Sequence, residues 1–268
     1  MSPSHLRRKW GSSSSLMDLL ESMPGGLIAA VRDFALLTLA GQLAMTFPEE
    51  LVFKGGFVLR HAHGVYRVSK DVDATRRNAP KHKFDSEEVA QAIRDASIRN
   101  IVRFQPKSPS TDSARSLDFD QIDVIGTDFP DSSVQVEVSY REELIDEPEL
   151  VNIGEPFYEP FEILTMTKEE MASEKLRAIA QRLRPTDLAD LSWLLSATPN
   201  SDDHIAELAV EKFKLVKSGR ENKRERLESR LDEMADTYDI EVPPLFPGAP
   251  SYKEAMAIVA PRLKRIVP

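Results

Sequence analysis

Residues 54–73 read KGGFVLRHAHGVYRVSKDVD, and their spacing decides the fold, because fourteen residues separate a Gly-Gly pair from the aspartates Asp71 and Asp73. Directly upstream, the sequence Leu51–Phe53 predicts a short buried strand. Gly55-Gly56 then lets the backbone turn tightly where a Cβ would block a triphosphate. Phosphate oxygens can therefore meet backbone amides and the N-terminus of a following helix at this turn.

The two aspartates belong to a predicted strand, Val65–Ala74. Its alternation places Ser69, Asp71 and Asp73 on one face, because successive side chains of a strand point to opposite sides. Two carboxylates on one face can share divalent metal ions. A Gly-Gly pair alone is usually a turn, and an Asp-x-Asp pair alone is usually a solvated face. Together, in this order and at this separation, they favour a site for metal and nucleotide.

A third carboxylate is expected on the predicted strand Ser133–Tyr140, which reads SVQVEVSY. Its valines share one face, and Glu137 lies on the other. Such a position is ordinarily no more than polar surface, but an Asp-x-Asp strand in the same sheet favours a role in the site. Asp123, on the neighbouring predicted strand Leu117–Ile125, is the competing candidate.

In the second half of the chain, Lys175 interrupts an apolar helical stripe. The other members of the stripe are Ala172, Leu176, Ile179, Ala180 and Leu183. A lysine in this position either extends its ammonium to water or binds a ligand phosphate, and the phosphate gives the stronger reason for its presence. Asp187 and Asp190 open the next predicted helix, where capping and the helix dipole alone explain acids.

The first half of the sequence alternates helix and strand, which predicts an α/β (α+β) lobe with a mixed sheet. The predicted helices are 26–45, 57–63 and 86–96, and the predicted strands are 51–53, 65–74, 100–104, 117–125 and 133–140, the last two forming a hairpin. A proline-containing connection (147–160) and a strand (161–166) follow. A capping box at Thr167 and Glu170 then starts a helix that Pro185 ends. Further helices are predicted at 187–196, 202–217, 220–235 and 252–266.

These patterns predict two domains. Residues 1–160 are expected to form a catalytic lobe with an N-terminal helix, and residues 161–268 a helical lobe that completes the nucleotide site. The most apolar stretch is interrupted by Arg32 and Asp33, which predicts a core helix and no membrane span. The basic start, followed by Gly11 and four serines, is expected to be a flexible segment and not a signal peptide.

Composition narrows the classes of protein. The 268 residues include no cysteine, which excludes disulfides, thiolate metal ligands and cysteine nucleophiles and agrees with a cytoplasmic protein. The net charge of -9 argues against a protein that coats nucleic acid, although a local basic track is compatible with it. The Lys212–Arg230 stretch mixes both signs of charge and is predicted to be a solvated helix face.

One short basic segment follows the Asp-x-Asp strand, and few acidic residues lie within it. It contains Arg76, Arg77, Lys81, His82 and Lys83. A phosphate-rich acceptor such as RNA could enter there, and an ordinary solvated loop is an equally good interpretation.

The sequence resembles the AbiEii/AbiGii family of toxin nucleotidyltransferases, which includes the MenT toxins. The family pattern is K-G-G-T, an R-x-S-x-D-x-D strand, a hydrophobic strand with an acid, and E-K-L and R-D-x-x-D on consecutive helices. The matching residues, between about Glu50 and Leu195, are Lys54, Gly55, Gly56, Arg67, Ser69, Asp71, Asp73, Glu137, Glu174, Lys175, Leu176, Asp187 and Asp190. The context VEVSYRE favours Glu137 over Asp123. Phe57 departs from the usual Thr or Ser, and Thr186 and Ala189 depart from the usual Arg and aromatic residue.

The resemblance implies a metal-dependent nucleotidyltransferase toxin that a separately encoded antitoxin controls. It implies that two Mg²⁺ ions bind to Asp71, Asp73 and Glu137, and that Lys175 and Asp187 take part in catalysis. It also implies that the NTP is bound by Lys54, Gly55, Gly56, Arg67, Ser69, Lys175 and Asp190. The implied acceptor is the 3′ end of tRNA, the nucleotide a pyrimidine such as CTP, and the result translation arrest.

Two alternatives stay open. One is nucleotidyl transfer to a protein or small-molecule hydroxyl, which the acidic net charge permits. The other is a noncatalytic interaction module that keeps the fold, for which Phe57 in place of the usual Thr is the only indication. The intact pair Asp71 and Asp73 argues against this second alternative.

Overall fold

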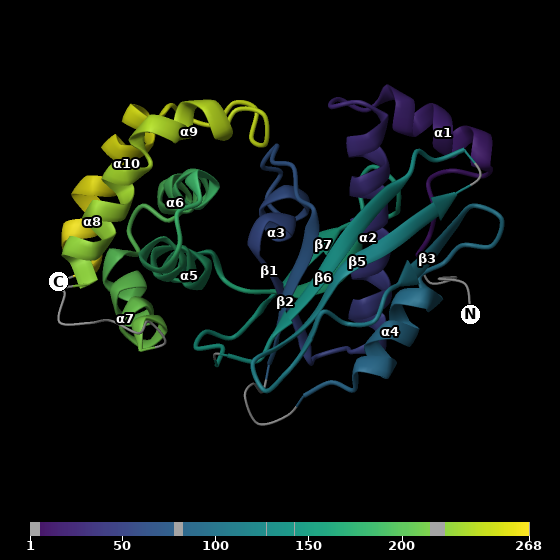
Figure 1. The fold of residues 1–268 in the computed structure, drawn as a ribbon, viewed down its shortest axis with the longest axis horizontal. Helices are drawn as coiled ribbons and strands as arrows, with labels where there is room; N and C mark the ends of the chain where they lie inside the picture. The colour runs from purple at the N-terminus through teal and green to yellow at the C-terminus, as the bar shows by residue number, and fades with distance from the viewer. Residues whose placement is uncertain (1–5, 78–82, 127, 142, 215–222, 268) are drawn as a thin grey trace. The chain divides into compact units, whose positions relative to one another are not determined.

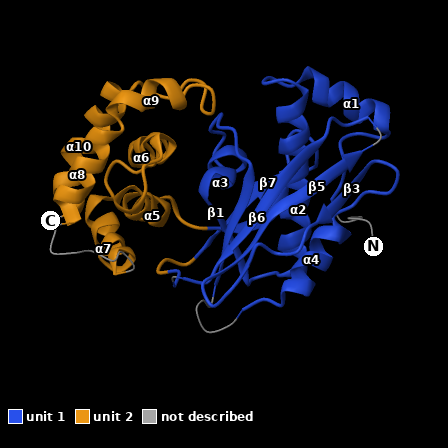
Figure 2. Cartoon of the chain, in the orientation of Figure 1, with its two compact units in different colours: residues 1–144, 148–165 blue, residues 145–147, 166–268 orange. Residues whose placement is uncertain are grey.

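The structure is a computed structural model that describes residues 6–77, 83–126, 128–141, 143–214 and 223–267 (Figure 1). The chain divides into two compact units (Figure 2). Unit 1 comprises residues 1–144 and 148–165, and unit 2 comprises residues 145–147 and 166–268. Unit 1 contains the sheet, and unit 2 is helical.

Unit 1 is built on an eight-stranded sheet of order β3-β5-β6-β2-β1-β8-β7, with the short strand β4 paired to β5. The strands are β1 (Leu51–Lys54), β2 (Asp71–Arg76), β3 (Val102–Pro106), β4 (Thr111–Asp112), β5 (Ser116–Gly126), β6 (Ser132–Ser139), β7 (Glu149–Ile153) and β8 (Phe161–Thr165). The β2–β6 and β1–β8 pairs are parallel, and the other pairs are antiparallel. The predicted mixed sheet and the β5–β6 hairpin are therefore confirmed.

In the part of unit 1 that the structure describes, four helices accompany this sheet. They are α1 (Ser13–Ser22), α2 (Leu27–Thr46), α3 (Gly55–His61) and α4 (Ser86–Asp95). Helix α2 contacts β2, β6 and β8, and in Figure 1 it runs behind the sheet. By length and composition α2 could cross a membrane, but 72% of its most apolar stretch is buried inside the protein. It therefore packs as a core helix, as the sequence predicts.

Several expectations for unit 1 are wrong. The serine-rich start is not flexible throughout, because Ser12 and Ser15 form a capping box that begins helix α1. Val65–Ala74 is not one strand, since β2 begins only at Asp71. The proline-containing connection after Glu147 includes β7, which pairs with β8.

Unit 2 contains the helices α5 (Lys168–Gln181), α6 (Pro185–Ala197), α7 (Asp202–Phe213), α8 (Lys223–Glu233), α9 (Ala235–Glu241) and α10 (Tyr252–Ile266). The Thr167 hydroxyl caps α5, as predicted, by accepting from the backbone N–H of Glu170 at 3.1 Å. The Glu170 carboxylate does not complete the capping box, because it accepts from the backbone N–H groups of Ile145 and Asp146. Pro185 starts α6 and does not itself end α5, which stops at Gln181. Proline fits the first turn of a helix because the N–H it lacks would have no intrahelical partner there.

Lys212 also differs from the prediction of a solvated helix face. Its side chain is 2% exposed, and its Nζ lies 2.6 Å from Glu170 Oε1 and 3.6 Å from Glu174 Oε1. A buried ammonium needs such partners, because an unpaired charge away from water is very costly. Residues 215–222, which belong to the same predicted face, lie outside the described part of the chain.

Candidate active site

The strand register of unit 1 brings the predicted acids together. Asp73 on β2 lies directly opposite Glu137 on β6, and Glu137 lies directly opposite Asp118 on β5. Residues directly opposite on paired strands point to the same face of a sheet. Asp73, Glu137 and Asp118 therefore form a row across three neighbouring strands, which we call the carboxylate row. Asp71 shares this face because it lies two residues before Asp73 on the same strand.

Gly55 fixes the place of Asp73. It follows β1 with a φ of +71°, and a Cβ at this position would lie 2.5 Å from Asp73 Oδ2. The Asp73 carboxylate therefore packs directly against the glycine backbone, in space that any other side chain would fill. Lys54, the residue before Gly55, lies opposite Asp73 in the β1–β2 pair, so the two side chains leave their strands on the same face of the sheet.

The second glycine makes room for Arg67. A Cβ on Gly56 would lie 1.7 Å from Arg67 Nη1, so the guanidinium occupies the space above this glycine. Ser69 is buried, and its hydroxyl donates to Asp71 Oδ1 at 2.9 Å. The segment before β2 is not a strand, but it places the Arg67 guanidinium against the Gly-Gly turn, and its Ser69 hydroxyl orients Asp71.

The side chain of Phe57 belongs to the core. It is fully buried, and its ring centroid lies 5.9 Å from that of Phe53 and 4.9 Å from that of His61. In this chain the position that departs from the family pattern faces the hydrophobic interior, where an aromatic side chain contributes packing.

The register also separates the two candidates for the third acid. Asp123 lies opposite Ser133, four residues along β6 from Glu137. Its carboxylate accepts from Gln121 Nε2 at 2.8 Å and lies 3.5 Å from Lys107 Nζ. Glu137 is thus the candidate that lies beside Asp73, and Asp123 belongs to a separate polar group with Gln121 and Lys107.

Asp118 is the member of the row that the sequence interpretation missed. It lies between the buried residues Leu117 and Phe119, so the alternation of β5 alone could have placed it on the polar face. Its Oδ2 accepts from the Ser116 hydroxyl at 3.0 Å.

The chemistry of these side chains suits Mg²⁺. Within the described ranges, no group of three or more His, Asp or Glu side chains is arranged to hold a metal ion. Mg²⁺ is usually bound by only one or two carboxylates and takes its other ligands from water and substrate phosphates. Asp71 and Asp73 on one face, with Glu137 beside Asp73, fit this kind of open site and not an all-protein cage.

In unit 2, Lys175 bridges two buried carboxylates of α6. Its Nζ lies 2.9 Å from Asp187 Oδ1 and 2.8 Å from Asp190 Oδ2, and the two carboxylates are 2% and 0% exposed. With 13% of its side chain exposed, Lys175 does not place its ammonium fully in water. The ion pairs explain why a lysine interrupts the apolar stripe of α5.

Arg182, at the C-terminal end of α5, is the second cation on Asp187. Its Nε lies 2.9 Å from Asp187 Oδ2 and its Nη2 lies 3.2 Å from Oδ1, a two-point contact. Burial alone would raise the pKa of Asp187, but the charges and hydrogen bonds of Lys175 and Arg182 outweigh it and hold that pKa well below its usual value. Thr186 stands where the family pattern has an arginine, and in this chain Arg182 is the arginine beside Asp187. The sequence interpretation missed Arg182 because its contact with Asp187 depends on the turn between α5 and α6.

Part of the predicted basic track has structural partners. Arg76 forms an ion pair with Glu50, and its guanidinium lies 4.2 Å from the centroid of the Phe84 ring. The backbone N–H of Arg77 donates to the Glu50 carbonyl at 2.8 Å. Lys83 is exposed, whereas Lys81 and His82 lie outside the described residues.

Comparisons with known proteins identify the family of the chain. The sequence profile described as "Nucleotidyl transferase AbiEii toxin, Type IV TA system" matches residues 39–260. The structure resembles MenT4, a nucleotidyltransferase toxin from Mycobacterium tuberculosis H37Rv, with a TM-score of 0.72, 21% identity and coverage of 96% of this chain and 90% of that one. It also resembles JHP933 from Helicobacter pylori, with a TM-score of 0.59, 18% identity and coverage of 89% and 91%. A search of curated proteins gives no significant match.

Proposed function

The chain belongs to the AbiEii family of nucleotidyltransferase toxins of toxin-antitoxin systems, and from this premise we propose that it transfers a nucleotide from an NTP to the 3′ end of an RNA. We propose tRNA as the acceptor, a pyrimidine nucleotide such as CTP as the donor and arrest of translation as the result. A separately encoded antitoxin would control the enzyme, and both would act in the cytoplasm.

In the proposed reaction the acceptor hydroxyl attacks the α-phosphorus of the NTP. The hydroxyl loses its proton to water, a bond forms between its oxygen and the α-phosphorus, the bond from that phosphorus to the oxygen that bridges to the β-phosphate breaks, and pyrophosphate leaves. Asp71, Asp73 and Glu137 would hold Mg²⁺, which when bound lowers the pKa of the attacking hydroxyl and neutralises charge on the phosphates. The backbone at Gly55 and Gly56 would bind the β- and γ-phosphates.

The observation that carries this proposal is the position of Asp73. Its carboxylate packs on the Gly55 backbone and lies opposite Glu137, so the turn proposed for phosphates and the acids proposed for the metal share one place in unit 1. Arg67, against Gly56, and Lys54, beside Asp73, would add positive charge for the phosphates, and Ser69 would keep Asp71 in position. Phosphoryl transfer requires carboxylates that hold the metal ion, cationic side chains that bind the phosphates, and backbone N–H groups that the phosphates can reach.

For unit 2 we propose that Lys175 contributes a positive charge to the bound nucleotide. Asp187 and Asp190 would act with it by holding the ammonium in one position through the two ion pairs. A fixed charge is more useful to a transition state than a mobile one, because it needs no reorganisation during the reaction.

The test is incubation of the protein with Mg²⁺ and each labelled NTP, with and without total RNA. We expect label on RNA, dependence on Mg²⁺ and loss of transfer in Asp73→Asn. Asp123→Asn is the matched control, because it removes a carboxylate of the same sheet that lies away from Asp73. Label on protein would contradict the RNA acceptor, and absence of transfer to any acceptor would favour the noncatalytic module.

We also propose that RNA phosphates contact Arg76, Arg77, Lys81 and Lys83. Neutralising a phosphate contact lowers the slope of log affinity against log salt by about one unit. Lys83→Gln is the cleanest variant, because Arg76 has a structural partner in Glu50. Filter binding of tRNA across a salt series with an unchanged slope would remove Lys83 from the proposed contact.

A further inference from the structure

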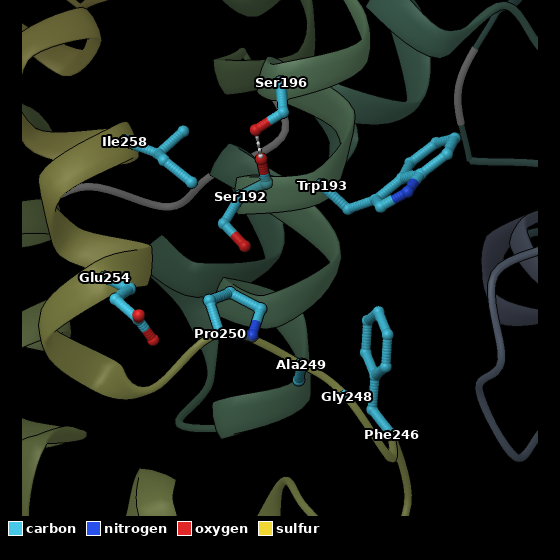
Figure 3. A pocket seen from close by; sticks show the side chains of 9 residues that line it. All are labelled: Ser192, Trp193, Ser196, Phe246, Gly248, Ala249, Pro250, Glu254 and Ile258. Atoms are coloured by element: carbon cyan, nitrogen blue, oxygen red, sulfur yellow. Dashed lines mark hydrogen bonds between the residues drawn. The ribbon is translucent and has the colours of Figure 1, made fainter.

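Unit 2 contains a pocket on the surface formed by α6, the loop before α10 and α10 itself (Figure 3). Its volume is about 490 Å³, within the range of small-molecule sites. The lining residues are Ser192, Trp193, Ser196, Phe246, Gly248, Ala249, Pro250, Glu254 and Ile258. Figure 3 shows Trp193 and Phe246 on one side of the pocket, Glu254 and Ile258 on the other, and Ser192 and Pro250 between them.

The aromatic side of the pocket suits a flat ring. Trp193 is half-buried, so part of its indole is open to a ligand, whereas Phe246 is 5% exposed and belongs to the packed wall of the pocket. Proline residues flank this loop at Pro247 and Pro250, which limits its conformations before any ligand binds. Stacking of a base on Trp or Phe is a major source of affinity in nucleic-acid binding.

The polar groups of the pocket accept hydrogen bonds. The Ser192 hydroxyl donates its proton to the Ala189 carbonyl, and the Ser196 hydroxyl donates to the Ser192 carbonyl, both at 2.8 Å. A hydroxyl has a single proton, so the Ser196 oxygen, which is exposed, can meet a ligand as an acceptor only, whereas Ser192 is buried in the wall of the pocket. Glu254 adds a carboxylate, and both hydrogen bonds of its helix cap go to Oε2, not to Oε1.

The charge of the pocket argues against a phosphate ligand. Glu254 is the one charged residue among those that line it, and none of them is basic. Hydrogen bonds from Ser251 lower the pKa of Glu254, so its side chain is a carboxylate at neutral pH. A ligand for this pocket therefore has a flat ring and hydrogen-bond donors, without a phosphate at its centre.

We propose that the pocket binds a nucleobase with an exocyclic amine (cytosine, adenine or guanine) and not uracil, an inference that rests on the nucleotidyl transfer proposed above because that reaction supplies the bases. The ring stacks on Trp193, and the two N–H groups of the amine donate to Glu254 Oε1 and to the Ser196 oxygen. Cytosine and adenine carry an amino donor where uracil carries a carbonyl acceptor. The base belongs either to the NTP or to the RNA acceptor.

The test uses Trp193 as the reporter. The chain has two tryptophans, so Trp10→Phe leaves Trp193 as the single indole. We expect saturable fluorescence quenching by cytidine and adenosine, with a Kd about tenfold or more below that of uridine. No saturable quenching, or equal affinity for cytidine and uridine, would overturn the proposal.

Glu254→Gln tests the source of the selectivity. Glutamine keeps an acceptor for the helix cap but places an NH₂ donor in the pocket. We expect the preference for cytidine over uridine to disappear while the thermal midpoint stays unchanged. Glu241→Gln, an exposed position at the end of α9, is the matched control and should keep the preference. An unchanged preference in Glu254→Gln would contradict the assigned contact.

Competition identifies which molecule carries the base. Displacement of cytidine by CTP assigns the pocket to the NTP, whereas displacement by a short cytidine-containing RNA and not by CTP assigns it to the acceptor. Displacement by neither would overturn the proposal. Binding and transfer are measured separately. Nucleotide transfer without nucleoside binding would contradict only the proposed role of the pocket, and nucleoside binding without transfer would contradict only the proposed function.

Discussion

Replacing Gly55 with alanine separates backbone strain from damage to the proposed site. Gly55 has a φ of +71°, where an L-residue costs about 1–2 kcal/mol. For a unit of this size, a loss of 1 kcal/mol lowers the thermal midpoint by about 2–4 °C. The new Cβ would also lie 2.5 Å from Asp73 Oδ2, so the carboxylate must move by about 1 Å to reach ordinary contact.

A displacement of about 1 Å in a catalytic group can reduce the rate about a hundredfold. We therefore expect Gly55→Ala to remain folded, with a modestly lower thermal midpoint, and to lose about two orders of magnitude in nucleotide transfer. The assays are thermal unfolding and pyrophosphate release with NTP and RNA.

Gly64 provides the matched control. Its φ is +68°, close to that of Gly55, but no atom lies within 4 Å of the Cβ that alanine would add. Gly64→Ala should lose the same 1–2 kcal/mol from strain and keep its transfer activity. If the two variants transfer nucleotide equally fast, the contact between Gly55 and Asp73 has no part in the reaction and the proposed site is refuted.

Three further predictions concern other charged groups. Glu137→Gln should reduce nucleotide transfer at least tenfold while Asp123→Asn leaves it unchanged, and the reverse order in a transfer assay would move the third acid to β5. Lys175→Met should lower the free energy of unfolding by about 3 kcal/mol, because it removes the cation that lies between two buried carboxylates, and adding Asp190→Asn should restore part of this loss in thermal unfolding. Burial lowers the pKa of His61 to about 3. Below pH 6.5 the unfolded chain therefore takes up a proton that the folded protein does not, and stability should fall by about 1.4 kcal/mol per pH unit between pH 6 and pH 5. His61→Gln should remove that dependence in denaturant titrations, and an unchanged slope would show that another group is responsible.

The parts of the fold that follow from local pattern were predictable from the sequence. Alternating valines around Glu137 predict a strand with one buried face, and the structure has that strand at Ser132–Ser139. The Thr167 cap and the helix from Tyr252 to Ile266 likewise depend on neighbouring residues only. Helix α1 was missed because a run of serines is compatible with both disorder and a helix start, and the outcome depends on burial of Leu16 and Leu20.

Contacts between distant segments could not be derived in this way. The sequence offered both Glu137 and Asp123 as the third acid, and only the pairing of β2 with β6 places one of them beside Asp73. Asp118 enters the carboxylate row through the register of β5, and a shift of one residue would have turned it to the core. Such registers are set by packing across the whole sheet, which no short pattern records.

The ion pairs of unit 2 show how a motif can have a structural basis that its spacing does not reveal. Lys175 and Arg182 provide two positive charges, and Asp187 and Asp190 provide two negative ones, so the group is neutral as a whole. The two carboxylates are buried, whereas the Arg182 side chain is 46% exposed, and desolvation of the carboxylates offsets much of the attraction between the charges, so the group contributes little to the net stability of the unit. Removing one member is costly all the same, since a charge then remains buried without its partner. The E-K-L and D-x-x-D sequences therefore constrain each other through α5 and α6, and substitutions in one motif should be tolerated only when the other changes with it.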